Sequence, residues 1–174
     1  MNEKYVITGG PSSGKTTIIG ELRKQGHKVI DEVARDVITT NPRLGPLERE
    51  LEIFRRQLER EIKTNYANAE RIFLDRGLLD VHAYCNLLLG YIPSDIARYD
   101  AKNRYAEVFV LDRLPFKEDG VRMEKDDDEA EKVHTALINT YQNHGYKPIH
   151  VPVFKGEIEE SVKKRIEFIM ESVL

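Results

Sequence analysis

The sequence has 174 residues, enough for one well-filled hydrophobic core and too few for two domains of ordinary size. Its 27 basic and 30 acidic residues give a net charge of −3, which argues against nucleic acid or an anionic membrane as the main partner. The sequence has a single cysteine, Cys85, and neither a secretion leader nor an apolar stretch of roughly 18 to 20 residues. We therefore expect one cytoplasmic domain over residues 1–174 without a membrane span. Homo-oligomerisation stays possible.

Residues 9–16 read Gly-Gly-Pro-Ser-Ser-Gly-Lys-Thr and match the phosphate-binding pattern G-x-x-x-x-G-K-[ST] at every fixed position. An apolar run at residues 5–7 precedes them and a helix-like stretch at residues 16–24 follows, which is the context the motif needs. Lys15 is expected against the β- and γ-phosphates of a nucleoside triphosphate, and the Thr16 hydroxyl is expected to hold Mg²⁺. The candidate nucleotide-binding residues are Gly9, Gly10, Pro11, Ser12, Ser13, Gly14, Lys15, Thr16 and Thr17.

A second short strand is expected at residues 27–30, and it ends in two acids, Asp31 and Glu32. Ligands gather at the carboxyl ends of parallel strands, so these acids belong beside the phosphate loop if this strand lies next to the first. Glu32, or Asp31 in its place, is a candidate to take the proton of an acceptor hydroxyl, and Asp31 and Arg35 are candidate substrate contacts. The alternative is that Asp31 or Glu32 only caps the helix that follows.

Residues 71–75 form an apolar run that closes on Asp75, and this pattern predicts a buried strand with a carboxylate at its end. Asp75 is the candidate for the second contact on the Mg²⁺ side. The next residue is Arg76, whereas ATP-driven motors usually carry a glutamate there to activate water. This difference favours transfer to a substrate over hydrolysis, and Arg76 is a further candidate substrate contact.

Another apolar strand is expected at residues 107–112, and a charged segment broken by Pro115 and Gly120 follows it. A mobile lid at about residues 113–127 would carry Arg113 and Arg122 over the transferring phosphate. A plain surface loop is the alternative.

Helical spacing of apolar residues predicts further helices at residues 47–65, 78–89, 130–143 and 158–173, with a last strand at residues 149–153. His82 lies inside one of these helices and is expected to be structural. Five strands that alternate with helices predict an α/β fold, a five-stranded parallel sheet with helices on both faces.

Four stretches together resemble one group of P-loop NTPases, the small kinase-like ATPases that include the ribosylnicotinamide kinase domain of bacterial NadR proteins. They are residues 9–17, the E-x-x-R of Glu32 and Arg35, the acid-ended strand at residues 73–75, and the P-x-x-x-D-G-x-R segment with Pro115, Asp119, Gly120 and Arg122. The resemblance implies a nucleoside or nucleotide kinase fold with a short lid, ATP and Mg²⁺. It leaves the acceptor open, since Asp75-Arg76 looks more like the Asp-Arg of thymidylate kinases.

These observations favour an ATP- and Mg²⁺-dependent phosphotransferase that acts on a nucleoside, a nucleotide or a related small metabolite. Lys15, Glu32, Asp75, Arg113 and Arg122 are the candidate catalytic residues, and Thr16 and Asp75 the candidate metal ligands. Two alternatives stay open, a nucleotide-dependent switch or binding protein and an NTP hydrolase without a small-molecule acceptor.

Overall fold

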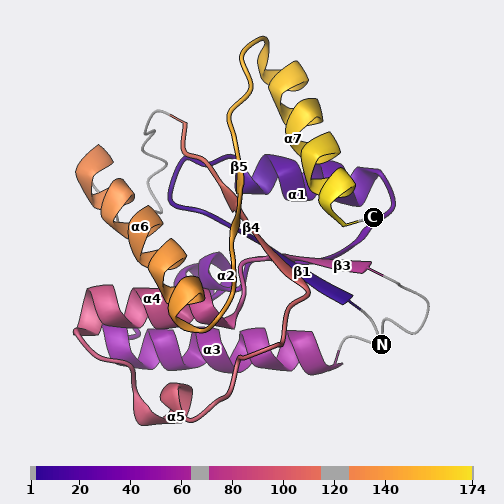
Figure 1. Ribbon diagram of the computed structural model, residues 1–174. Helices are drawn as coiled ribbons and strands as arrows, with labels where there is room; N and C mark the ends of the chain where they lie inside the picture. Colours follow the sequence, from indigo (N-terminus) through magenta and orange to yellow (C-terminus); the bar gives the residue numbers. More distant parts are fainter. Residues whose placement is uncertain (1–2, 64–70, 115–125, 174) are drawn as a thin grey trace.

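A computed structural model describes residues 3–63, 71–114 and 126–173 of the chain (Figure 1). Its centre is one sheet of five parallel strands in the order β2-β3-β1-β4-β5. The strands are β1 (Glu3–Thr8), β2 (Lys28–Ile30), β3 (Arg71–Asp75), β4 (Glu107–Leu111) and β5 (Ile149–Val151). Because β1 lies in the middle, the loop that follows it opens at the centre of the carboxyl edge of the sheet.

Both faces of the sheet are buried, and successive strand residues point to opposite sides. Ile7 of β1 and Phe73 of β3 pack into one hydrophobic cluster, whereas their neighbours Val6 and Leu74 pack into another. Two apolar layers therefore enclose the sheet, which explains why the central strands read as continuous apolar runs.

The helices form one layer on each side of the sheet (Figure 1). Helices α1 (Lys15–Lys24) and α7 (Ile158–Ser172) cover one face and contact each other. Helices α3 (Pro46–Lys63), α4 (Leu78–Leu89) and α6 (Asp127–Asn143) form the other layer, with α2 (Ala34–Thr40) against α3 and the short α5 (Ser94–Ala97) at its edge. In the part of the chain that the structure describes, no helix has both the length and the apolarity that a membrane crossing requires.

The predicted α/β sheet with helices on both faces is confirmed, and three details differ from the sequence-based expectation. Strand β2 pairs with β3 and not with β1, so the acids after β2 reach the loop across β3. Helices α2 and α5 were not expected from the sequence. Helix α2 has seven residues, four of them β-branched, and buries only Val37, so its apolar pattern is weak.

Candidate functional site

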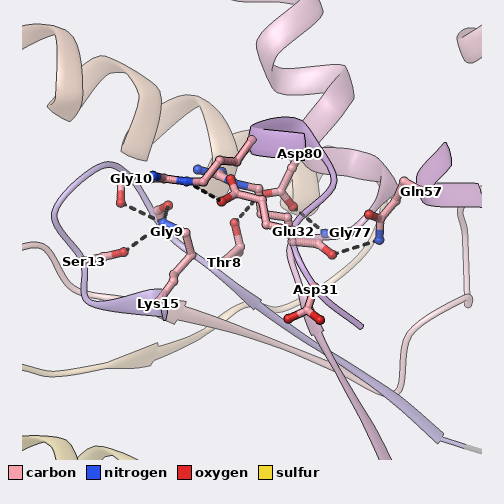
Figure 2. Close-up of polar contacts among 12 residues, drawn as sticks. Thr8, Gly9, Gly10, Ser13, Lys15, Asp31, Glu32, Gln57, Gly77 and Asp80 are labelled. Atoms are coloured by element: carbon pink, nitrogen blue, oxygen red, sulfur yellow. Dashed lines mark hydrogen bonds and ion pairs between the residues drawn. The ribbon is translucent and has the colours of Figure 1, made fainter. Parts of the chain in front are cut away.

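The phosphate loop joins β1 to α1 at the carboxyl edge of the sheet (Figure 2). Gly14 is the N-cap of α1 and has φ 83°, a left-handed conformation that disfavours side chains. Gly10 is needed for a different reason, because a Cβ there would lie 2.8 Å from the His134 Cβ and 3.0 Å from the Ala130 carbonyl oxygen. The loop thus presents the open N-terminus of α1 while packing tightly against α6.

Lys15 bends back over this loop. Its Nζ donates to the Gly9 carbonyl at 2.7 Å, to the Gly10 carbonyl at 3.1 Å and to the Ser13 hydroxyl at 3.2 Å (Figure 2). Burial, together with a nearby arginine, lowers the pKa of Lys15 to about 8, although three neighbouring carboxylates act in the opposite direction. The ammonium group is therefore held where phosphate oxygens can replace loop carbonyls as its partners.

A cavity of about 570 Å³ opens beside the loop. It is lined by residues 11–17 and 32–35, by Ile38, by Glu50, Ile53 and Gln57 of α3, by Arg76, Gly77, Asp80, Val81 and Tyr84, and by Leu114 and Ile158. This volume and this mixture of apolar walls with a few polar groups are typical of small-molecule sites.

Glu32 and Arg76 meet in this cavity. The Arg76 Nε donates to the Glu32 Oε1 at 2.8 Å, and its Nη1 donates to the Asp80 Oδ1 at 3.2 Å. Burial alone would raise the pKa of Glu32, but Arg76 and Lys15 together hold it below its usual value. Glu32 is therefore ionised at neutral pH and faces the same space as the phosphate loop.

The two other candidates near β2 differ in their surroundings. The Asp31 side chain is 65% exposed, pairs with Arg23 and does not line the cavity; Figure 2 shows it pointing away from Lys15. Neither Asp31 nor Glu32 caps α2, whose N-cap is Val33. Arg35 lines the cavity with its Nε 3.9 Å from the Glu32 Oε2. Of the two acids, only Glu32 lines the cavity.

Asp75 ends β3, pairs with Ile7 of β1 just before the loop and is not among the residues that line the cavity. It is buried, and its Oδ1 has no hydrogen-bond partner among the residues described. Burial and the neighbouring Glu32 raise its pKa to about 6. A buried carboxylate oxygen without a donor is costly, and a cation would relieve that cost. With the exposed Thr16 hydroxyl on the cavity wall, Asp75 fits the residue set expected for Mg²⁺.

Of the expected lid at residues 113–127, residues 115–125, including Arg122, lie outside the described residues. Arg113 does not line the cavity. Its Nε donates to the Pro11 carbonyl at 3.3 Å, and its two terminal nitrogens pair with Asp127 and Glu131 of α6. Arg113 therefore connects the phosphate loop to α6, and its contact with a transferring phosphate stays a prediction.

Sequence reasoning missed three residues that hold the site together. Asp80 accepts from the Thr8 hydroxyl at 2.6 Å, from the Gly77 N–H at 3.0 Å and from the Tyr141 hydroxyl at 2.6 Å, as well as from Arg76. His134 of α6 accepts from the Gly10 N–H at 3.1 Å, and Arg165 of α7 donates to the Ser13 carbonyl at 2.7 Å. An acid inside the apolar run at residues 78–89 was the one local signal, for Asp80; the other two depend on tertiary packing.

Comparisons with known proteins agree with this geometry. The model of the AAA domain family matches residues 4–161, and no curated protein matches the chain. Among solved structures, a NadR protein in complex with NR is 20% identical with a TM-score of 0.72; the match covers 99% of this chain and 50% of the NadR chain. This chain thus spans about half the length of that protein.

Two other solved structures match over nearly their full length. Thymidylate kinase from Ehrlichia chaffeensis is 14% identical with a TM-score of 0.70, and deoxyadenosine kinase from M. mycoides with bound dATP is 18% identical with a TM-score of 0.65; each match covers 99% of both chains. At these identities the likeness shows a shared fold. With the family match over most of the sequence, the chain belongs to the AAA domain family and is a P-loop NTPase with a nucleoside-kinase-like fold.

Proposed function

We propose that this protein transfers a phosphoryl group from ATP to a hydroxyl group of a small molecule. The observation that carries the proposal is the placement of Glu32, an ionised carboxylate that lines the same cavity as the phosphate loop and is held there by Arg76 at 2.8 Å. A switch needs no such carboxylate beside the loop, and an ATP-driven hydrolase usually carries its glutamate directly after the acid-ended strand, where this chain has Arg76. Transfer to a hydroxyl needs a group that takes the hydroxyl proton.

The other residues have distinct roles in this proposal. The loop N–H groups and Lys15 bind the triphosphate, and the residues that would hold Mg²⁺ are Thr16 and Asp75. A bound Mg²⁺ would neutralise charge on the phosphates. Arg76, which Glu32 and Asp80 orient, and Arg35 lie beside the acceptor, and Arg122 is proposed to close over it. In-line positioning of the two substrates supplies most of the rate enhancement.

The known structures support a nucleoside-like acceptor. Two of them are a thymidylate kinase and a deoxyadenosine kinase, whose folds this chain shares. Glu32 favours an acceptor that arrives with a protonated hydroxyl over one that presents a phosphate, because the carboxylate would repel an anion at this position.

Incubation with labelled ATP, Mg²⁺ and a panel of nucleosides, nucleotides and vitamins tests the proposal. We expect a phosphorylated product that depends on the acceptor. Glu32→Gln should lower the transfer rate on the order of a hundredfold while ATP affinity changes little, since the amide keeps the size but cannot take a proton. Asp31→Asn is the matched control, because Asp31 lies outside the cavity.

Other outcomes identify the alternatives. ADP release at the same rate with and without every acceptor would indicate a hydrolase. ATP binding without turnover would indicate a switch or binding protein. A full rate in Glu32→Gln would contradict the assigned proton acceptor.

A further inference from the structure

One face of α3 forms the wall of the cavity that lies away from the phosphate loop. Glu50, Ile53 and Gln57 are three and four positions apart, so they share a face of the helix, and all three line the cavity. They are only 2%, 6% and 3% exposed. This stripe offers one apolar side chain between two polar ones, about 10 Å apart along the helix at 1.5 Å per residue.

The orientation of the Gln57 carboxamide follows from its partners. Its Nε2 donates to the Glu61 Oε1 at 3.0 Å and to the Arg76 carbonyl oxygen at 3.2 Å. Both partners are acceptors, so the nitrogen must occupy this position and the amide cannot flip. Within the described residues nothing donates to the Gln57 Oε1, and this oxygen is the polar atom that the side chain has left to offer the cavity.

Glu61 fixes this arrangement from behind. Its side chain is fully buried, and it accepts from the Arg104 Nε at 2.6 Å and from the Tyr105 hydroxyl at 3.2 Å. The carboxylate is thereby held in place as the partner of the Gln57 Nε2. The network cannot readily reverse, because Arg104 and Tyr105 both donate to Glu61.

Glu50 is the second polar group of the stripe. The only partner that the structure records for it in the residues described is the Arg49 Nε, at 3.4 Å, a long contact for an ion pair. Burial raises the pKa of Glu50, while Arg49 acts in the opposite direction. The cavity wall also carries apolar side chains, among them Val33, Ile38 and Val81.

We infer that the stripe formed by Glu50, Ile53 and Gln57 determines acceptor specificity, and that it selects a flat, uncharged or cationic ring that carries N–H donors. This inference rests on the proposed function, because it assigns the ring of the acceptor to the far wall of the cavity while the hydroxyl group lies at Glu32. The stripe presents acceptor oxygens and no donor, so it disfavours a ring that carries a carboxylate or lacks N–H groups.

Two pairs of ribosides test this inference by calorimetric binding in the presence of a non-hydrolysable ATP analogue and Mg²⁺. Adenosine and purine riboside differ by one amino group, and nicotinamide riboside and nicotinic acid riboside differ by an amide against a carboxylate. In at least one pair, we expect the member with N–H donors to bind about tenfold or more tightly, as the loss of a buried hydrogen bond to a polar site predicts. Equal affinities within both pairs, or no binding of any of the four, would overturn it.

Variants locate the effect on α3. Glu50→Gln removes a negative charge and adds a donor, so it should strengthen binding of nicotinic acid riboside severalfold and reduce the difference within that pair. Gln57→Met should reduce the difference within the adenosine pair. Glu52→Gln is the matched control, because Glu52 pairs with Arg55 and Arg56 and does not line the cavity. Unchanged ratios in both cavity variants would refute the assignment.

Binding and turnover separate this inference from the proposed function. If the ribosides with N–H donors bind more tightly but no phosphoryl group is transferred, the specificity role of the stripe is supported and the proposed kinase activity is refuted. Transfer to all four ribosides with equal KM would support the kinase and refute the stripe.

Discussion

Arg165→Met tests a side chain that makes several hydrogen bonds at the site. Arg165 is 3% exposed, and besides a long contact with the Val151 carbonyl at 3.5 Å its guanidinium donates to three main-chain carbonyls, those of Ser13 at 2.7 Å, Asp112 at 2.6 Å and Pro152 at 2.9 Å. These carbonyls belong to the phosphate loop and to the segments that follow β4 and β5. One side chain therefore joins three segments at the carboxyl edge of the sheet.

Methionine would fill much of the same space without any donor. Each buried carbonyl left without a partner costs about 1–3 kcal/mol, and three of them set an upper range of roughly 3–9 kcal/mol. Two effects reduce this cost. Water can reach part of the opened site, and the variant no longer buries a charge whose hydrogen-bond partners are neutral carbonyls. We expect a net loss of about 2–4 kcal/mol in the free energy of unfolding.

Urea unfolding of both proteins, with and without Mg-ATP, measures this loss. We also expect weaker ATP binding in Arg165→Met, because the Ser13 carbonyl would lose the contact that holds the loop open. Lys164→Met is the matched control: Lys164 is exposed and pairs with Glu160 on the surface of α7, where such pairs contribute about 0–1 kcal/mol. A loss in Arg165→Met below about 1 kcal/mol, or equal to that of the control, would refute this reasoning.

Three further substitutions probe other parts of the site. Lys15→Ala should abolish measurable transfer and weaken ATP binding in a filter-binding assay, because the loop loses its ammonium donor; unchanged affinity would contradict the loop assignment. Asp75→Asn should raise the Mg²⁺ concentration needed for half-maximal activity, and an identical titration would remove Asp75 from the metal site. His82 is buried with both ring nitrogens unpartnered in the described structure, and burial lowers its pKa from 6.5 to about 4. Between these pH values only the unfolded chain binds the proton, so the free energy of unfolding of the wild type should decrease as the pH falls from 6.5 to about 4. The free energy of unfolding of His82→Phe should decrease less. Parallel curves for the two proteins from about pH 7 to 4 would show that His82 does not contribute to this pH dependence.

The parts of the protein that sequence could predict are the contiguous ones. The phosphate loop is a local motif, and the central strands are long apolar runs, so the fold and the P-loop class are confirmed. The roles of Glu32 and Asp75 followed from their positions at strand ends and stay predictions. The pairing of Arg113 with α6 depends on how a distant helix packs, and no local pattern signals it.

The contact between α3 and the site could not be predicted from the sequence either, because it involves a residue with a strained backbone, Arg76. Arg76 is not glycine and yet has φ 72°, a conformation that costs about 1–2 kcal/mol and persists only where the surroundings enforce it. The Arg76 N–H donates to the Ile7 carbonyl at 3.1 Å, and the Arg76 carbonyl accepts from Gln57 at 3.2 Å. Sequence spacing cannot reveal a left-handed arginine, because the strain is held by contacts from β1 and α3.

This arrangement joins the two ends of the cavity. Gln57 offers its oxygen to the acceptor wall, and its nitrogen holds the turn that aims Arg76 at Glu32. Glu50 lies on the same wall, and among the described residues its hydrogen bond goes to Arg49 and not to that turn. Changes at Gln57 should therefore lower kcat and raise the acceptor KM together, while Glu50→Gln should change the acceptor KM alone. Steady-state kinetics of both variants measure this difference, and a kcat loss of equal size in the two would show that the orientation of Arg76 does not depend on Gln57.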